Sequence, residues 1–294
     1  MDAKKIDKIA TVVFYLIAAF VVFILGLFLI YILYKGFGML TPSFIFGKPT
    51  LTRAGGGIGP QIFNSLYMLV ISLLITVPIG IGAGIYLAEY AKEGVILNII
   101  RLSLETMSSL PSIVIGMFGL LIFVNFLGFG YSIIAGALSV SILNIPSMTR
   151  ISENAIRNAS KMVKEASLGL GATKWQTIMK VTIKVAMKDI LTGIILSSGR
   201  IFGEAAAFLY TAGLSSGGLN FSNISLTGNN SAFSLFRPAE TLAVHIWKLN
   251  SEGVVPDAAN IANGTAAVLI IMILLFNLLA KLIGNRMLKS YSGE

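Results

Sequence analysis

Long runs without a charged side chain constrain the fold of this chain more than any other feature. Asp, Glu, Lys and Arg are all absent from residues 11–34, 62–88, 106–149 and 258–280. A helix needs about 20 apolar residues, at about 1.5 Å each, to cross the ~30 Å hydrocarbon core of a bilayer. These runs therefore predict membrane-spanning helices.

The composition agrees with this prediction. The 294 residues are 55% hydrophobic and 12% charged, with a mean hydropathy of +0.85, whereas soluble domains have about 25% charged residues. The chain contains no cysteine, which excludes disulfides, thiolate metal sites and cysteine catalysis. Its one histidine, His245, cannot form a histidine-ligated metal centre alone.

Six spans are expected in total. The run 106–149 is too long for one helix, and turn-forming residues around Gly128 and Gly130 divide it into two spans. A fifth span is expected at 190–212, although it contains two charged residues. No small-residue cleavage site follows the first run, so we expect a retained anchor rather than a signal peptide. The predicted fold class is an all-α integral membrane protein.

The distribution of basic residues predicts the orientation. Sixteen Lys and Arg residues lie in the two terminal segments, the connection before the third span and the loop 150–189, and five lie in the alternate connections. Cytoplasmic segments carry the excess of Lys and Arg. We therefore expect both termini in the cytoplasm of a protein in the cell membrane, and the connections 35–61 and 213–257 outside. This pattern explains the net charge of +9 without a nucleic-acid partner.

Two charged residues, Arg200 and Glu204, lie inside the fifth expected span. Each costs about 2.5–3.5 kcal/mol at the bilayer centre on an insertion scale, so both are expected to face protein or water. They are four residues apart and therefore share one helix face. One interpretation is a structural ion pair. The other is the lining of a solute path, because the planar guanidinium group donates two parallel hydrogen bonds to phosphate-like anions.

Arg150 and Glu153 repeat this arrangement where the fourth span is expected to meet the cytoplasm. They are three residues apart, again on one face. Arg101 and Glu105, at the start of the third span, form a third possible pair, for which an ordinary ion pair at the membrane edge is the favoured interpretation.

Glycines at helical spacing predict close contacts between helices. Gly80 and Gly84 form one such pair, and Gly199 and Gly203 form another. Small residues at this spacing let helix backbones approach each other. Pro111 is expected to kink its helix, because proline lacks the backbone donor.

The loop 150–189 is named here the coupling loop. It carries eight basic and three acidic residues. Helix-forming residues from Lys161 onward are followed by Gly169 and Gly171, which predicts a short helix that ends in a glycine turn. Thr173 and Gln176 fit a capping box at the start of a second helix. From these residues alone, the loop is either a docking element for a cytoplasmic partner or a basic amphipathic element on anionic lipid.

A resemblance separates these two interpretations. Glu165-Ala166-Ser167, Gly171 and Val181-Thr182-Ile183 resemble the EAA motif of ABC importer permeases. The resemblance implies a type I importer permease fold in which this loop carries the coupling helix that sits in a cleft of an ATP-binding subunit. Ser167 stands where the family usually has alanine, and Lys184 where it usually has proline. The residues implied in coupling are Glu165, Ala166, Ser167, Gly169, Gly171 and Ala172.

Further segments resemble the A-type permeases of phosphate-specific (Pst) importers, and together they cover about residues 61–287. The segments are Asn64–Tyr67, Pro78–Gly82, Tyr86–Ala91, Leu104–Thr106, Leu110–Gly116, Gly199–Ala205, Val244–Trp247 and Ser251–Gly253. In that family, an Arg/Glu pair on the fifth span and another before the EAA loop are associated with phosphate passage. Arg200, Glu204, Arg150 and Glu153 match those positions.

The resemblance implies the permease subunit of an ATP-driven phosphate importer. Its implied partners are a homologous C-type permease subunit, two ATP-binding subunits, an external phosphate-binding protein, phosphate and membrane lipid. The sequence has no Gly-x-x-x-x-Gly-Lys-Ser/Thr loop, so we expect no enzymatic activity and no cofactor in this chain, with ATP and Mg²⁺ bound by the partner subunits. The expected units are an anchor with its external loop at 1–60, a transport domain at 61–287 and a tail at 288–294.

Three alternatives remain open at this point. The first is a permease for another oxyanion, such as sulfate, molybdate or phosphonate. The second is a channel or transporter that works without ATP. The third is a membrane subunit that signals phosphate status without carrying phosphate.

Overall fold

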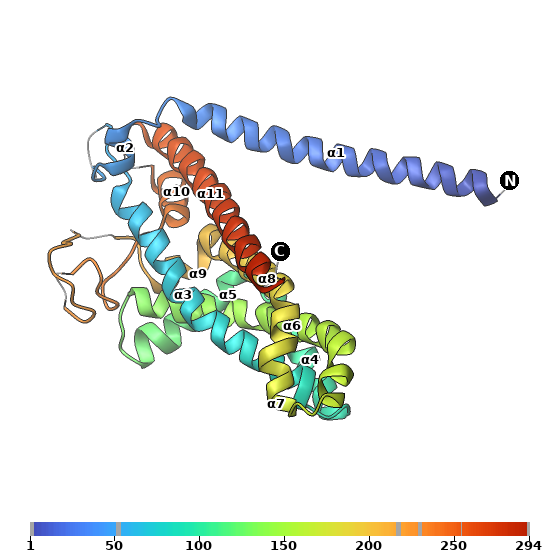
Figure 1. Cartoon of the computed structure of the whole chain (residues 1–294). Helices are drawn as coiled ribbons and strands as arrows, with labels where there is room; N and C mark the ends of the chain where they lie inside the picture. The colour runs from blue at the N-terminus through green and yellow to red at the C-terminus, as the bar shows by residue number, and fades with distance from the viewer. Residues whose placement is uncertain (1–2, 51–53, 216–218, 229–230, 254, 293–294) are drawn as a thin grey trace.

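The computed structural model describes residues 3–50, 54–215, 219–228, 231–253 and 255–292, and within them all regular structure is helical (Figure 1). This confirms the all-α prediction. The α-helices are α1 (Ala3–Phe37), α2 (Pro42–Phe46), α3 (Gly59–Ile85), α4 (Val95–Ser108), α5 (Ser112–Gly119), α6 (Ile133–Gly169), α7 (Lys174–Thr177), α8 (Ile183–Gly203), α9 (Ala206–Thr211), α10 (Leu242–Glu252) and α11 (Ala258–Ser292). Three π-helical turns, η1 (Tyr86–Tyr90), η2 (Leu120–Phe126) and η3 (Ile178–Thr182), continue α3, α5 and α7.

The described helices do not confirm the expected total of six spans. Lys4–Phe37, Gly59–Tyr90, Ile133–Gly169 and Ala258–Arg286 are long and apolar enough to cross a membrane. A fifth span exists if α4 and α5, which meet at an angle of 95°, are counted as one. Pro111 lies at this bend in an extended conformation, since proline cannot continue the hydrogen-bond ladder of α4. The helix at this position therefore starts at Val95 rather than at residue 106, and it is broken rather than kinked.

The expected fifth span, 190–212, is also broken. α8 ends at Gly203, Glu204 is extended with a ψ angle of 121°, and α9 begins at Ala206. In contrast, the division of residues 106–149 is confirmed, because η2 ends at Phe126 and both glycines of the following turn have positive φ angles.

α6 is the central helix and packs against α3, α4, α5, α8 and α9. It lies close to α3 at Gly80 and Gly84, where an added Cβ atom would lie 2.6 Å from Met148 and 2.5 Å from Ser152. This confirms the predicted close contact. Gly199 and Gly203 differ, since a Cβ atom on either would meet no described atom within 4 Å.

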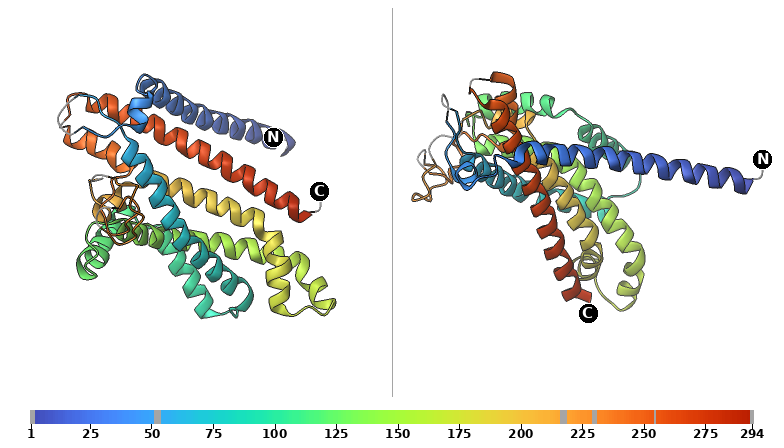
Figure 2. Two further views of the ribbon diagram at one scale, coloured as in Figure 1. Left: turned by 60° about the vertical axis from the view of Figure 1, so that its left-hand side comes forward. Right: turned by 90° about the horizontal axis from the view of Figure 1, so that it is seen from above.

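α1 lies apart from the rest of the bundle along most of its length (Figures 1 and 2). It packs against α11 near its C-terminal end, where Gly36 approaches the Asn263 carbonyl and Ala267. In the left view of Figure 2, the start of α1, the end of α11 and the turn between α6 and α7 lie toward one end of the molecule. The tail expected at 288–294 continues α11 as far as Ser292, and its last two residues lie outside the described part.

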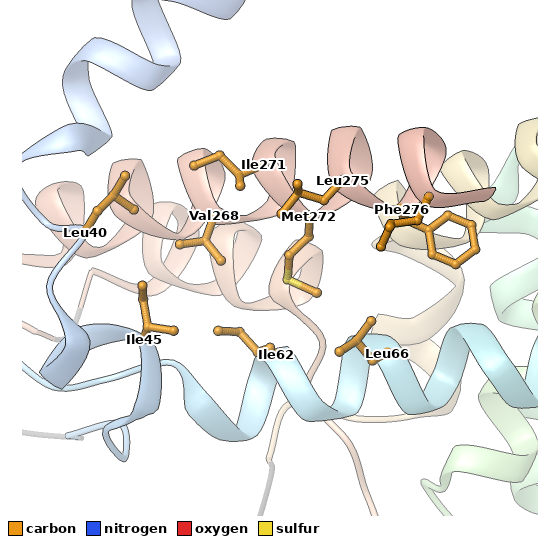
Figure 3. Close-up of a pocket in the computed structure, with 10 residues that line it drawn as sticks. Leu40, Ile45, Ile62, Leu66, Val268, Ile271, Met272, Leu275 and Phe276 are labelled. Atoms are coloured by element: carbon orange, nitrogen blue, oxygen red, sulfur yellow. The ribbon is translucent and has the colours of Figure 1, made fainter. Parts of the chain in front are cut away.

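A groove of about 390 Å³ lies between α3 and α11 (Figure 3). All ten side chains that line it are apolar, among them Leu66, Met272 and Phe276. These side chains offer no hydrogen-bond donor to an anion. The groove is therefore not a candidate for the path of a charged solute.

Candidate transport path and coupling loop

Glu153 is the centre of a charged cluster on α6. Its side chain is only 1% exposed, and three guanidinium groups surround its carboxylate. Arg150 Nη1 lies 3.2 Å from Oε2, Arg157 Nη2 lies 3.0 Å from Oε1, and Arg101 Nη2 lies 2.7 Å from Oε1. The structure thus brings Arg150 and Glu153 together as expected. A buried carboxylate is stable only when it is paired in this way.

The expected pair between Arg101 and Glu105 is wrong. α4 packs across α6, which directs Arg101 to Glu153, while Glu105 lies on the exposed face of α4. Glu93, in the turn before α4, lies 3.6 Å from Arg101 and 3.4 Å from Arg157. These three arginines and two glutamates form what we call the arginine cluster. The sequence analysis missed Arg157, although its spacing of four residues from Glu153 was a usable signal.

The expectation that Arg200 and Glu204 share one helix face is wrong, and the structure does not support the interpretation of the two residues as an ion pair. Because α8 ends at Gly203, the two residues no longer lie on one helix face. The buried carboxylate of Glu204 instead accepts a hydrogen bond of 3.0 Å from the backbone N–H of Ala207, in the first turn of α9. Arg200 is exposed, and its Nη1 donates to the hydroxyl of Ser147 on α6 at 3.3 Å.

These contacts align the basic residues along one face of α6. Ser147, Arg150 and Glu153 follow each other at intervals of three residues, and Arg157 follows one turn later, so all four share a face. Arg200 adds its guanidinium group at the Ser147 end. The stripe from Ser147 to Arg157 is about 15 Å long, at ~1.5 Å per residue. An exposed arginine in hydrocarbon is costly, so this face must meet water or another protein.

The coupling loop contains the predicted turn and cap. α6 ends at Gly169, and Gly171 has a φ angle of +83°. The N–H of Gln176 donates to Thr173 Oγ1 at 3.2 Å, and the N–H of Thr173 donates to Gln176 Oε1 at 2.9 Å. One expectation is wrong, because α6 continues without a break from Ile133, so no separate short helix exists before the turn.

The residues around the turn form an exposed tip. Glu165, Ala166, Gly169 and Gly171 are exposed, whereas Ser167 and Ala172 are half-buried. The apolar side chains of Leu170 and Trp175 are 90% and 59% exposed. Exposed apolar side chains grouped at one tip are typical of a protein-binding surface.

Two details concern the residues that depart from the family pattern. The hydroxyl of Ser167 lies 2.9 Å from that of Thr177, so this residue joins the helices on the two sides of the turn. α8 continues through Lys184 without a break.

A second polar network fixes the connection 213–257 to α3. Glu240 Oε1 lies 3.1 Å from His245 Nδ1 and 3.6 Å from Lys248 Nζ, and Gln61 donates to Glu240 Oε2 at 2.9 Å. Burial alone raises the pKa of the Glu240 carboxyl, but these neighbours outweigh it and hold the pKa below its ordinary value. The sequence analysis identified only the histidine of this network.

Arg237 extends this contact. It donates to the Asn64 side chain of α3 at 2.8 Å and to the carbonyl oxygens of Ala232 and Pro238. Burial lowers the pKa of Arg237 to about 10. In the described part of the chain, no group of three or more His, Cys, Asp or Glu side chains is placed to hold a metal ion.

Comparison with known proteins places this architecture among membrane transport subunits. The family described as "Binding-protein-dependent transport system inner membrane component" matches residues 80–291. The probable ABC transporter permease protein YqgI of Bacillus subtilis is 50% identical over 295 residues, which cover 100% of both chains. The phosphate transport system permease protein PstA of Yersinia pestis is 32% identical over 278 residues, covering 91% of this chain and 88% of that relative.

The fold is also similar to a solved structure. A chain of the methionine ABC transporter MetNI in an inward-facing conformation matches with a TM-score of 0.54 and 17% sequence identity. The match covers 77% of this chain and 92% of that chain. At this level of identity the similarity concerns the fold alone, and it confirms a type I ABC permease fold.

Proposed function

The chain belongs to the family of binding-protein-dependent transport system inner membrane components, and we propose that it is the A-type permease subunit of an ATP-driven phosphate importer. Membership of this family makes the chain a multi-pass membrane permease of an ABC transporter. Phosphate as the solute is our proposal. It is supported by the 30–32% identity to PstA proteins of Yersinia pestis and Pasteurella multocida over most of the chain.

The observation that carries the proposal is the line of arginines along one face of α6, to which α8 contributes Arg200. Arg150 lies on this face, and Arg200 reaches the same face from α8 through its hydrogen bond to Ser147. Arginine presents a fixed fork of donors that matches the oxygens of a phosphate-like anion. Arg200 receives the anion, and Arg150 lies next along the path. Glu153 balances the arginine cluster, so that the anion is not held too tightly to leave.

The exposure of Arg200 beside this face implies that a second subunit completes the path. We propose that a homologous C-type permease subunit covers the face and completes a water-filled path. This arrangement keeps the guanidinium group of Arg200 out of hydrocarbon, where it costs about 2.5–3.5 kcal/mol. In the same assembly, residues 61–287 form the transport domain, and the connection 213–257 faces an external phosphate-binding protein.

The exposed tip of the coupling loop is the proposed contact with an ATP-binding subunit. Glu165, Ala166, Ser167, Gly169, Gly171 and Ala172 form or support this tip. Two such subunits bind ATP and Mg²⁺, and their closure moves the tip. The coupling loop and both termini then lie in the cytoplasm, as the excess of basic residues indicates.

The substrate is tested by uptake in cells that lack their own phosphate import and express the complete complex. We expect uptake of labelled phosphate that an excess of unlabelled phosphate abolishes and that sulfate, molybdate and phosphonate leave unchanged. If one of these other anions is the better competitor, the solute is that oxyanion. If uptake persists when the ATP-binding subunits are omitted, the coupling to ATP is refuted.

A further inference from the structure

Both sides of the coupling loop contact one residue at the end of α3. Lys164, on α6 before the glycine turn, has its Nζ 2.7 Å from Glu89 Oε2. Lys174, on α7 after the turn, donates to the backbone carbonyl oxygen of Glu89 and lies 4.5 Å from the centroid of the Tyr90 ring. Glu89 is thus bound by one lysine from each side of the turn.

The burial of this contact makes it persistent. The side chain of Glu89 is 2% exposed, while that of Lys164 is 36% exposed. A carboxylate this deeply buried depends on its partner, because separation leaves an uncompensated charge away from water. Separation costs the lysine far less free energy, since its side chain already reaches solvent. The pair therefore resists any movement of the loop that does not carry Glu89 with it.

The two sides of the loop are also joined to each other. Ser167 and Thr177 share a hydrogen bond of 2.9 Å across the turn. Because this bond lies close to both lysines in the sequence, α7 and the end of α6 are held as one unit. A force on the exposed tip is therefore delivered to Glu89 from both sides.

Glu89 passes this force to a long helix. It lies in η1, which continues α3 without a gap from Ile85. Further along, α3 touches α6 at Gly80 and Gly84, and the second contact is at Ser152, beside Glu153 of the arginine cluster. A displacement of Glu89 therefore acts on a helix that packs directly beside the proposed anion path.

We propose that Glu89 is the positioning residue through which the coupling loop moves α3. This inference rests on the proposed function, in which ATP-binding subunits displace the exposed tip. Nucleotide binding shifts the loop, the two lysines carry Glu89, and the C-terminal end of α3 follows. The ion pair itself stays closed throughout this movement.

Because this chain contains no cysteine, two introduced cysteines can carry spin labels in a complete complex whose other subunits have no reactive cysteine. The labels are placed at Tyr86→Cys and Phe126→Cys, whose native side chains are 57% and 84% exposed. Pulsed electron spin resonance then measures the distance between the labels with and without a non-hydrolysable ATP analogue. We expect the distance to change when the nucleotide binds, and the change to be lost in Glu89→Gln and in Lys164→Gln.

Glu105→Gln is the matched control, because it makes the same chemical change on an exposed carboxylate of α4. It is expected to keep the full change in distance. The proposal is overturned if the change persists in the two test variants, if it is absent from the complex that carries only the labels, or if neither test variant assembles. The measurement needs no phosphate, so a failure of phosphate uptake is recognised separately from a failure of this inference.

Discussion

At the scale of single residues, Arg200 carries the clearest prediction. Arg200→Ala is expected to lower phosphate uptake about ten-fold or more, because a hydrogen bond to a charged group is worth about 1.5–3 kcal/mol. Assembly is expected to be unchanged, since the side chain is exposed and its hydrogen bond is to the hydroxyl of Ser147. Arg200→Lys keeps the charge but loses the planar fork, so its uptake should be intermediate.

Arg286→Ala is the control for this series, because Arg286 is an exposed arginine on α11 and is not a member of the arginine cluster. Labelled phosphate uptake and the yield of the assembled complex are measured together. Normal uptake by Arg200→Ala refutes the role of this residue in the path.

Glu240 gives a prediction about pH. Its folded pKa is held below the ordinary value of 4.5, so the folded state binds its proton less readily than the unfolded state. The stabilisation is therefore complete above about pH 4.5 and is lost as the pH falls through the folded pKa. Thermal unfolding of the purified protein, followed from pH 7 to pH 3, should show a falling melting temperature below pH 4.5.

The variant Glu240→Gln separates this contribution from the titration of other carboxylates. It removes the charge of a buried carboxylate that His245, Lys248 and Gln61 contact, so its melting temperature is expected to be lower at pH 7. Below pH 4.5, the melting temperature of this variant should fall less steeply with pH than that of the unmodified protein. Parallel curves for the two proteins argue against the assigned role of Glu240.

At the scale of helices, the contact between α3 and α6 allows a matched pair of substitutions. A Cβ atom on Gly84 would lie 2.5 Å from Ser152 Cβ and 2.8 Å from the backbone nitrogen of Glu153, whereas one on Gly82 would meet nothing within 4 Å. Gly84→Ala is expected to destabilise the protein by about 1–3 kcal/mol through overpacking. Gly82→Ala should be neutral or stabilising by up to ~1 kcal/mol, because alanine favours helix. Denaturation of both variants in detergent measures the difference in their stabilities. Equal stabilities contradict the close contact between α3 and α6 at Gly84.

The glycine turn of the coupling loop permits a test based on conformation alone. Gly171 has a φ angle of +83° and open space around it, so only the backbone restricts its replacement. Gly171→Val forces a β-branched residue into this region and is expected to uncouple ATP hydrolysis from uptake. Gly171→Asn tolerates the left-handed conformation and should stay coupled. The measured quantity is the ATP hydrolysed per phosphate imported, and an unchanged ratio in the valine variant contradicts the docking of this turn.

Features set by nearby residues could be predicted at this scale, and features set by packing could not. The cap at Thr173 depends on a residue three positions away, and the turn at Gly171 depends on that glycine itself, so both were readable from the sequence. The partner of Arg101 could not be predicted, because it depends on how α4 crosses α6. The break at Glu204 was missed because the apolar segment 190–212 predicted one continuous helix. In the structure α8 ends at Gly203, and the carboxylate of Glu204 caps the next helix by accepting a hydrogen bond from the N–H of Ala207.

At the scale of the whole molecule, the chain has the surfaces of one component of an assembly. α1 exposes apolar side chains along most of its length, Arg200 is exposed beside α6, and the tip of the coupling loop presents Leu170 to solvent. Apolar runs predicted the helices that cross the membrane. The total of six was not recovered, because one span is broken at Pro111 and because α8, although it has 21 residues, carries Lys184, Lys188, Asp189 and Arg200.

The most direct test of the proposed function is phosphate transport by the complete complex in sealed proteoliposomes that contain both permeases, the ATP-binding subunits and the phosphate-binding protein. ATP is supplied either on the side of the coupling loop or on the opposite side. We predict that labelled phosphate crosses the membrane toward the side of the coupling loop, and only when ATP is present on that side. Transport without ATP, or no phosphate transport when ATP is present on the side of the coupling loop, contradicts the assignment.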